Sequence, residues 1–219
     1  MLAITEVHRF NLPAASRGRN VSGTTAHTPT RPRASGSNTS DGALIKAIAL
    51  GDRRAMELLY ARHGVRVYRF SLRITGDAAV AEDIASEVFL EVWRRADRFK
   101  ADSQVSTWLL AIARNKSHSA LHRRVHVPLE DERVTLVEDP ADGPEISVYN
   151  KDRNALVQAC LSQLSTAHQD VIDLIYFQEK SVEDVARIVG APASTVKTRV
   201  FYARHRMAEL LNSAGLNGS

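Results

Sequence analysis

The chain has 219 residues, enough for one ordinary domain or two small ones, and its composition of 44 % hydrophobic and 25 % charged residues is typical of a globular protein. No apolar run is long enough to span a bilayer, and the start, MLAITEVHRF, lacks the continuous apolar core of a secretory signal. The single cysteine, Cys160, excludes an internal disulfide; we therefore expect a cytoplasmic protein with a buried, unreactive thiol.

The net charge of +4 is unevenly distributed along the chain. Residues 1–40 carry a net charge of +4, residues 41–126 carry +5, residues 127–150 carry −6 and residues 151–219 carry +1. Basic regions interrupted by an acidic one favour a polyanionic partner and a segment with a separate role. Residues 1–40 are rich in Ser, Thr, Pro, Gly and Arg without helical or strand periodicity, which predicts a disordered basic tail.

Residues 41–126 are predicted to form a first helical domain. From Ala79 to Ala96 apolar residues recur at helical spacing, which indicates a helix with one buried face. The opposite face carries four other side chains: Asp83, Glu87, Leu90 and Arg94. A lone exposed leucine is common on protein surfaces, so Leu90 by itself does not identify a binding site.

The stretch STWLLAIARNKSHSALHRRV, residues 106–125, is predicted to combine a packing face with a basic outward face. The packing residues are Trp108, Leu109, Ile112 and Leu121. The residues expected to point outward are Arg114, Asn115, Lys116, His118, His122, Arg123 and Arg124. Basic residues beside an aromatic ring suit single-stranded or distorted nucleic acid, although Trp108 is better explained as a core residue than as a stacking platform.

The rest of the chain is predicted to contain a linker and a second helical domain, so the fold class is all-α. Residues 127–150, VPLEDERVTLVEDPADGPEISVYN, are acidic and contain three prolines, which predicts a flexible linker. Residues 151–212 form the second domain, and residues 213–219 are a short disordered tail.

The second domain has the start and stop signals of a helix-turn-helix. Two residue pairs have capping-box spacing: Thr166 with Gln169, and Ser181 with Asp184. The helix from Val182 to Val189 is predicted to end at Gly190, and residues 191–192 to open the next helix. A short helix, a turn with glycine and a longer basic helix make up a helix-turn-helix.

This last helix has two distinct faces. Its inward stripe is Val196, Val200, Ala203, Met207 and Leu210, and its outward strip is Ser194, Thr198, Phe201, Tyr202 and His205. Four cations flank the outward strip: Lys197, Arg199, Arg204 and Arg206. A helix in the major groove needs short polar side chains at the base edges and cations near both phosphate walls, so we expect DNA binding rather than an ordinary solvated basic face.

Three blocks of this sequence together resemble the extracytoplasmic-function sigma factors of bacteria. They are AMELLYARHGVRVYRFSLRITGDAAVAEDIASEVFLEVWRRADRF, STWLLAIARN and VKTRVFYARHRMAELL, within a match from about Asp41 to Leu211. The resemblance implies a dissociable initiation subunit that binds the clamp and flap regions of core RNA polymerase. Its first domain would open the promoter at the minus-ten element, its second would read the minus-thirty-five element, and an anti-sigma factor would control it.

The resemblance also implies roles for individual residues. Those at the polymerase clamp are Asp83, Glu87, Leu90 and Arg94. Those near the minus-ten element are Trp108, Asn115, Lys116, Arg123 and Arg124, with residues 100–106 placed to hold an extruded base. Those at the minus-thirty-five element are Ser194, Thr195, Lys197, Thr198, Arg199, Tyr202 and Arg206. The counterpart of the acidic linker threads through polymerase channels.

Two other functions are weighed against this one. The first is a free-standing helix-turn-helix regulator that binds duplex DNA without polymerase. The second is a nucleic-acid enzyme, for which His118, His122 and His126 would be metal ligands at i, i+4 and i+8. No fourth ligand is evident, the neighbours are cations, and no catalytic pair or glycine-rich phosphate loop is present, so we expect no metal, no cofactor and no catalysis.

Overall fold

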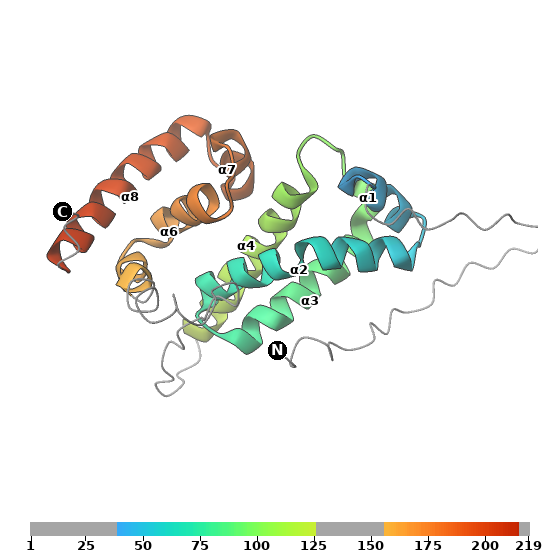
Figure 1. Ribbon diagram of the computed structural model, residues 1–219, viewed down its shortest axis with the longest axis horizontal. Helices are drawn as coiled ribbons and strands as arrows, with labels where there is room; N and C mark the ends of the chain where they lie inside the picture. Colours follow the sequence, from blue (N-terminus) through green and yellow to red (C-terminus); the bar gives the residue numbers. More distant parts are fainter. Residues whose placement is uncertain (1–38, 126–155, 215–219) are drawn as a thin grey trace, which may run out of the picture. The chain divides into compact units, whose positions relative to one another are not determined.

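The computed structural model describes residues 39–125 and 156–214, and every regular element in these two ranges is helical, which confirms the all-α prediction (Figure 1). Residues 1–38 of the predicted tail, the predicted linker 127–150 and residues 215–219 lie outside the described residues. Within the described ranges no helix is both long and apolar enough to cross a membrane.

The N-terminal helices are α1 (Asp41–Ala49), α2 (Arg53–Thr75), α3 (Ala78–Arg95), the short 3-10 helix η1 (Ala96–Arg98) and α4 (Val105–Val125). Side-chain caps set their starts: Ser40 accepts from the Ala43 amide, and Asp52 accepts from the first amides of α2. Between α2 and α3 the chain turns at Gly76, whose φ of 67° lies in the left-handed region that favours glycine.

Helices α2, α3 and α4 pack side by side around one core, with α1 against α2 (Figure 1). The predicted stripe of the third helix is confirmed, because its apolar residues from Ala81 to Val92 are buried. Phe89 is fully buried there, and its ring lies edge-on to that of Tyr60 with 4.8 Å between centroids.

The C-terminal helices are α6 (Thr166–Ile172), the π-helical turn η2 (Asp173–Phe177), α7 (Val182–Val189) and α8 (Ala193–Ser213), and residues 156–162 are also helical. Helix α8 packs on α6 and α7. The predicted inward stripe of α8 is confirmed: Val196 and Ala203 are buried, and the other three members pack partly buried against the core. Cys160 is buried, as predicted.

The predicted helix ends are partly correct. Ser181 caps α7 by accepting from the Asp184 amide, and α7 ends at Gly190 with φ 66°, as predicted. The capping box at Thr166 and Gln169 is wrong, since Ser165 occupies the cap position of α6. The side-chain amide of Gln169 instead donates hydrogen bonds to the backbone carbonyls of Leu161 and Leu164, which precede α6. Helix α8 begins at Ala193, one residue after the predicted opening.

Candidate nucleic-acid interface

The outward strip of α8 is exposed along its whole length, since Ser194, Thr198, Phe201, Tyr202 and His205 are all exposed. Phe201 is 67 % exposed and Tyr202 is 56 % exposed, and their rings lie edge-to-face with 5.4 Å between centroids. Because the opposite side of the same helix is buried, α8 holds this strip rigidly toward solvent. Two large exposed aromatic rings side by side indicate a contact surface.

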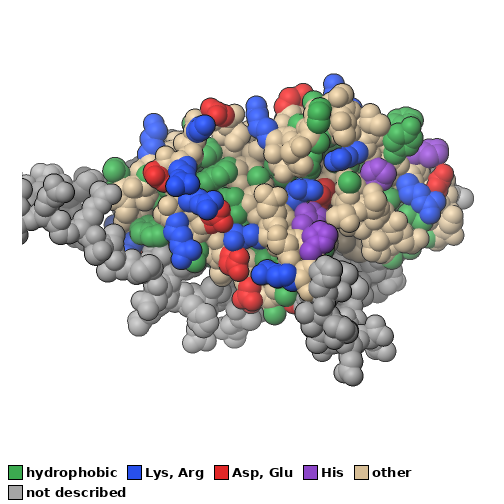
Figure 2. All heavy atoms as spheres, turned by 180° about the vertical axis from the view of Figure 1, so that it is seen from behind, with side chains coloured by type: hydrophobic (Ala, Val, Ile, Leu, Met, Phe, Trp, Pro, Cys, Tyr) green, Lys and Arg blue, Asp and Glu red, His purple; other side chains and the backbone are tan. Residues whose placement is uncertain are grey.

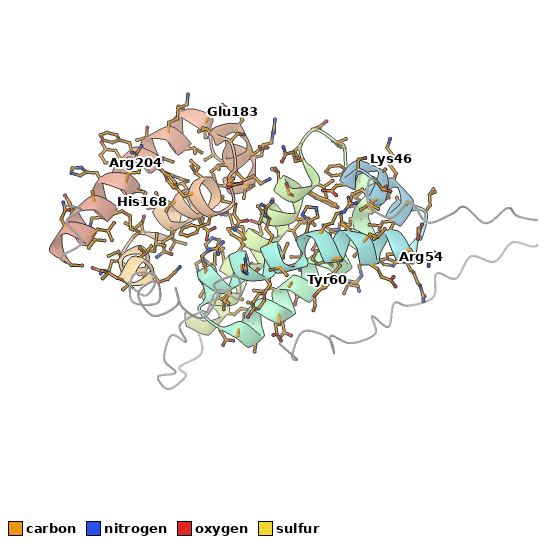
Figure 3. All side chains as sticks on the ribbon, viewed as in Figure 1. Lys46, Arg54, Tyr60, His168, Glu183 and Arg204 are labelled. Atoms are coloured by element: carbon orange, nitrogen blue, oxygen red, sulfur yellow. The ribbon has the colours of Figure 1, made fainter. Side chains whose placement is uncertain are left out.

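The cations of α8 differ in how freely they can reach a phosphate. Lys197, Arg204 and Arg206 are exposed, while Arg199 is half-buried. Figure 3 labels Arg204 on α8. The Arg206 Nη1 atom donates to Glu209 Oε2 at 2.8 Å, and this hydrogen bond lowers the pKa of the Glu209 carboxyl. An exposed pair of this kind is weak, so Arg206 can exchange the carboxylate for a phosphate. The small residue Thr195 lies half-buried at the start of the helix.

Helix α4 carries the residues predicted to meet the minus-ten element, in varied environments. Asn115 and Arg123 are exposed, and the side chain of Arg124 lies outside the described residues. Trp108 is half-buried, and its ring packs against that of Phe99 with 5.1 Å between centroids. Trp108 is therefore part of the core edge, as the packing interpretation expects.

Lys116 of α4 is held by the acidic side of α3. Its Nζ atom lies 2.9 Å from Glu87 Oε2 and 3.5 Å from Glu91 Oε2. Sequence reasoning assigned Lys116 to DNA and Glu87 to the polymerase, and the structure brings these two side chains into contact. On the same α3 face, Asp83 and Arg94 are exposed and Leu90 is half-buried.

The loop between η1 and α4 borders an open pocket of about 300 Å³. Its lining residues are Asp41, Gly42, Phe99, Ala101, Ser103, Gln104, Val105 and Ser106. The set combines a ring, backbone and short polar side chains, which is what a nucleobase would need for stacking and hydrogen bonding. Ala101 has φ 56°, a left-handed conformation that is strained for alanine.

Two residues predicted to point outward from α4 do not, and this corrects the sequence-based expectation. Arg114 Nε donates to Asp170 Oδ2 at 2.7 Å, and His118 Nε2 lies 3.0 Å from Asp170 Oδ1. The carboxylate of Asp170 is 2 % exposed, and a buried carboxylate is stabilised by charge-assisted hydrogen bonds from basic groups such as these. The histidine spacing that suggested metal ligands is thus explained at His118 by a hydrogen bond, while His126 lies outside the described residues.

Sequence reasoning missed four buried ionisable residues of the described ranges: His63, Asp170, Asp173 and Lys180. Arg73 donates to both oxygens of Asp173, and the Arg73 guanidinium also lies over the Phe177 ring. Burial raises the pKa of the Asp173 carboxyl, against the lowering effect of Arg73. The available signal was one acid, Asp173, inside the apolar run 171–175 and a second, Asp170, immediately before it.

Figure 2 shows one face of the molecule on which lysine and arginine side chains are spread widely, with acidic side chains among them. Cations interspersed with acids are typical of a solvated protein surface.

Comparison with known proteins gives two family matches. The family described as Sigma-70 region 2 matches residues 59–126, and the family described as Sigma-70, region 4 matches residues 154–207. The chain is 30 % identical over 181 residues to the RNA polymerase sigma-H factor of Pseudomonas aeruginosa, covering 78 % of this chain and 93 % of that protein. It is 31 % identical over 179 residues to the ECF RNA polymerase sigma factor SigL of Mycobacterium tuberculosis, covering 80 % of this chain and 98 % of that protein.

Solved structures agree with these matches. The sigma factor RpoE of Bartonella quintana, solved in complex with the anti-sigma factor NepR, superimposes with a TM-score of 0.57 and 26 % identity. That match covers 70 % of this chain and 94 % of that one. CnrH, solved in complex with the cytosolic domain of CnrY, has the same fold with a TM-score of 0.60 and 24 % identity, covering 79 % of this chain and 97 % of that one.

Proposed function

Because this chain belongs to the extracytoplasmic-function group of RNA polymerase sigma factors, we propose that α3, α4 and α8 are its polymerase, minus-ten and minus-thirty-five surfaces, respectively. The function that follows is to bind core RNA polymerase, to direct it to promoters and to assist melting there, without catalysis by the chain itself. The observation that best supports this proposal is the two-sided character of α8. The helix buries one apolar stripe and exposes a polar and aromatic strip between cations.

The minus-thirty-five surface is the first half of α8. Ser194, Thr195 and Thr198 supply short polar side chains there, and Lys197 and Arg199 lie on opposite edges. A recognition helix contacts base edges mainly through its N-terminal residues. Tyr202 and Arg206 continue the same face and would reach sugar and phosphate groups.

The minus-ten surface consists of the exposed side of α4 and the pocket beside it. Asn115 and Arg123 are available for backbone and base contacts. The pocket next to Phe99 and Ser106 is the candidate site for an extruded base, because it offers a ring and polar groups within one concave surface. Trp108 would act indirectly, because its ring packs against the Phe99 ring, with 5.1 Å between centroids, and so helps to fix the position of Phe99.

The polymerase surface is the outer face of α3. Leu90 is half-buried among exposed Asp83, Glu87 and Arg94, so an apolar anchor is surrounded by a charged rim. The Lys116–Glu87 ion pair joins this face to α4, which supports a proposal in which the polymerase and minus-ten surfaces are neighbours on the N-terminal helices.

An anti-sigma factor is proposed as the regulator of this chain. The observation in support is the Bartonella quintana relative, which was solved with such a partner and resembles this chain over most of its length. Regulation of this kind would act by covering the polymerase surface.

The test is binding to purified bacterial core RNA polymerase by wild type, Leu90→Glu and Leu50→Glu. Leu50 follows α1 and is 90 % exposed, so Leu50→Glu makes the same chemical change away from the α3 face. We expect wild type and Leu50→Glu to bind alike and Leu90→Glu to bind at least about tenfold more weakly. Failure of the folded wild type to bind polymerase, together with selective binding to duplex DNA alone, would replace this proposal with a free-standing regulator.

A further inference from the structure

The centre of the outward strip of α8 is apolar, although its edges are basic. Phe201 is 67 % exposed and lies in line with Ser194, Thr198 and His205, which precede or follow it at spacings of three or four residues. A phenylalanine ring has no hydrogen-bond donor or acceptor, so it cannot pair with the polar edge of a base. A large ring left in water at the centre of a contact strip therefore indicates a partner with an apolar group at the same place.

Thr198 adds a second apolar group beside this ring. Its Oγ1 atom donates to the Ser194 carbonyl at 3.1 Å, so the hydroxyl hydrogen is used within the helix. Because Thr198 is exposed, its methyl group remains for an outside contact. We call Thr198 and Phe201 the apolar patch of α8.

Tyr202 supports the patch from one side. The Phe201 and Tyr202 rings have 5.4 Å between centroids and 79° between planes, the edge-to-face arrangement that aromatic pairs favour. Successive residues of an α-helix are rotated by about 100°, so Phe201 lies at the centre of the strip while Tyr202 lies toward the edge that carries Arg206. The second ring therefore limits the movement of the first.

The charges around the apolar patch suit the two phosphate walls of a major groove. Lys197 and Arg204 lie on one edge of the strip and Arg206 lies on the other, and all three are exposed. Helix α8 carries one carboxylate, Glu209, which pairs with Arg206 at 2.8 Å. Glu209 lies about 12 Å along the helix axis from Phe201, so it does not place a negative charge beside the patch.

The major groove offers one base group that matches an apolar patch. Guanine presents two acceptors there, cytosine an amino donor, adenine an acceptor and a donor, and thymine an acceptor together with its C5 methyl group. Phenylalanine rings and threonine methyl groups make apolar contacts with that methyl group. A strip that acted through hydrogen bonds alone would not distinguish thymine from deoxyuridine, which has the same polar groups and lacks the methyl.

We propose that Phe201, together with Thr198, reads thymine C5 methyl groups in the major groove of the minus-thirty-five element. Tyr202 is a positioning residue that fixes the Phe201 ring. The inference rests on the proposed function, because it names the base group that the minus-thirty-five surface recognises. Promoters used by this chain accordingly carry at least one thymine in that element whose methyl group is contacted.

The first test replaces thymine by 2′-deoxyuridine, one position at a time. A duplex is selected from a random pool with the holoenzyme, and its upstream half is resynthesised with the single replacements. Holoenzyme affinity for each duplex is then measured by fluorescence anisotropy. We expect wild type to bind about fourfold more weakly when a contacted methyl group is missing, which corresponds to the burial of one such group.

The variants are Phe201→Ala, Tyr202→Phe and Leu50→Ala. Phe201→Ala should bind the thymine and deoxyuridine duplexes equally. Tyr202→Phe keeps the ring, so it should retain the preference for thymine even where the lost hydroxyl lowers affinity for both duplexes. Leu50→Ala truncates a 90 % exposed apolar side chain outside α8 and should match wild type. The ratio of the two affinities does not respond to partial unfolding, which lowers both alike.

The second test locates the methyl group directly. The responsive thymine is replaced by 5-iodo-2′-deoxyuridine, which carries iodine in place of the methyl group and forms crosslinks to adjacent aromatic rings on irradiation. Trypsin cleaves after Arg199 and Arg204, so a crosslink to the aromatic pair is recovered on peptide 200–204. We expect this peptide, with fragmentation in the mass spectrometer placing the nucleotide on Phe201.

The outcomes separate this inference from the proposed function. A thymine preference that is unchanged in Phe201→Ala, the absence of any deoxyuridine effect in wild type, or a crosslink to another peptide would overturn the reading of thymine by Phe201. Normal polymerase binding and promoter selection in the same experiments would leave the sigma-factor function standing. Failure of the folded wild type to bind core polymerase would overturn the proposed function itself.

Discussion

The two faces of α8 make opposite predictions for two substitutions five residues apart. Val196 is fully buried, and Phe201 is 67 % exposed. Val196→Ala removes two buried methyl groups, and each contributes about 0.8 kcal/mol to the free energy of unfolding. The residual cavity brings the total loss of stability to about 2 kcal/mol. Phe201→Ala removes more atoms, but most of them are already in water, so its effect on stability should stay within about 0.5 kcal/mol.

The assay pairs stability with promoter affinity. Urea unfolding of the full chain should show the loss for Val196→Ala, equivalent to a Tm lower by about 4–8 °C. Affinity is measured with holoenzyme on a duplex selected from a random pool, under conditions in which both variants are folded. We expect Phe201→Ala to weaken it at least about fivefold and Val196→Ala to leave it nearly unchanged. Comparable destabilisation by Phe201→Ala, with unaltered DNA affinity, would refute the assignment of the aromatic strip to DNA.

Three further predictions concern single sites. Gly190→Ala should destabilise the chain by about 1 kcal/mol in urea unfolding, because φ 66° is unfavourable for alanine although no atom lies within 4 Å of the added Cβ. Lys197→Ala should weaken holoenzyme binding to duplex DNA and reduce its logarithmic salt dependence by about 1, since the exposed cation is placed for a phosphate; an unchanged slope would remove it from the phosphate contacts. Burial opposes ionisation of Asp41, but hydrogen bonds from Arg62 and His63 lower its pKa below 3.8 overall. The resulting stability is present above pH 3.8 and is lost as the pH falls through the lowered pKa, so acid should destabilise wild type more than Asp41→Asn in urea unfolding.

Features that depend on local periodicity were predictable from sequence. The buried stripes of α3 and α8 follow from apolar residues at helical spacing, which no distant contact needs to specify. The end of α7 at Gly190 is equally local, because only glycine adopts the left-handed conformation there without strain. The start of α6 was misplaced by one residue, since Ser165 and Thr166 are both good cap residues and sequence alone does not choose between them.

The buried acids of α6 and η2 could not have been assigned from sequence in the same way. Arg114 lies 56 residues before Asp170, and Arg73 lies 100 residues before Asp173. Nothing in the periodicity of either helix identifies such a partner, because the pairing depends on how the two sets of helices meet. The basic residues of α4 were therefore all assigned to the outside, and Arg114 and His118 proved to be exceptions.

Burial also governs the electrostatics of these contacts. Burial raises the pKa of Asp173, although Arg73 opposes the shift, and burial lowers the pKa of Lys180. The Asp173 contribution to stability is present below the ordinary pKa of 3.8 and is lost as the pH rises through the raised pKa. The Lys180 contribution is present above 10.5 and is lost as the pH falls through the lowered pKa, so burial makes the charged form of either group costly. Hydrogen bonds from Arg73 and to Ser106 offset part of that cost only while the contacts are intact. Contacts of this kind are specific in geometry, because each buried charge is compensated only by the partners that it has in the folded chain.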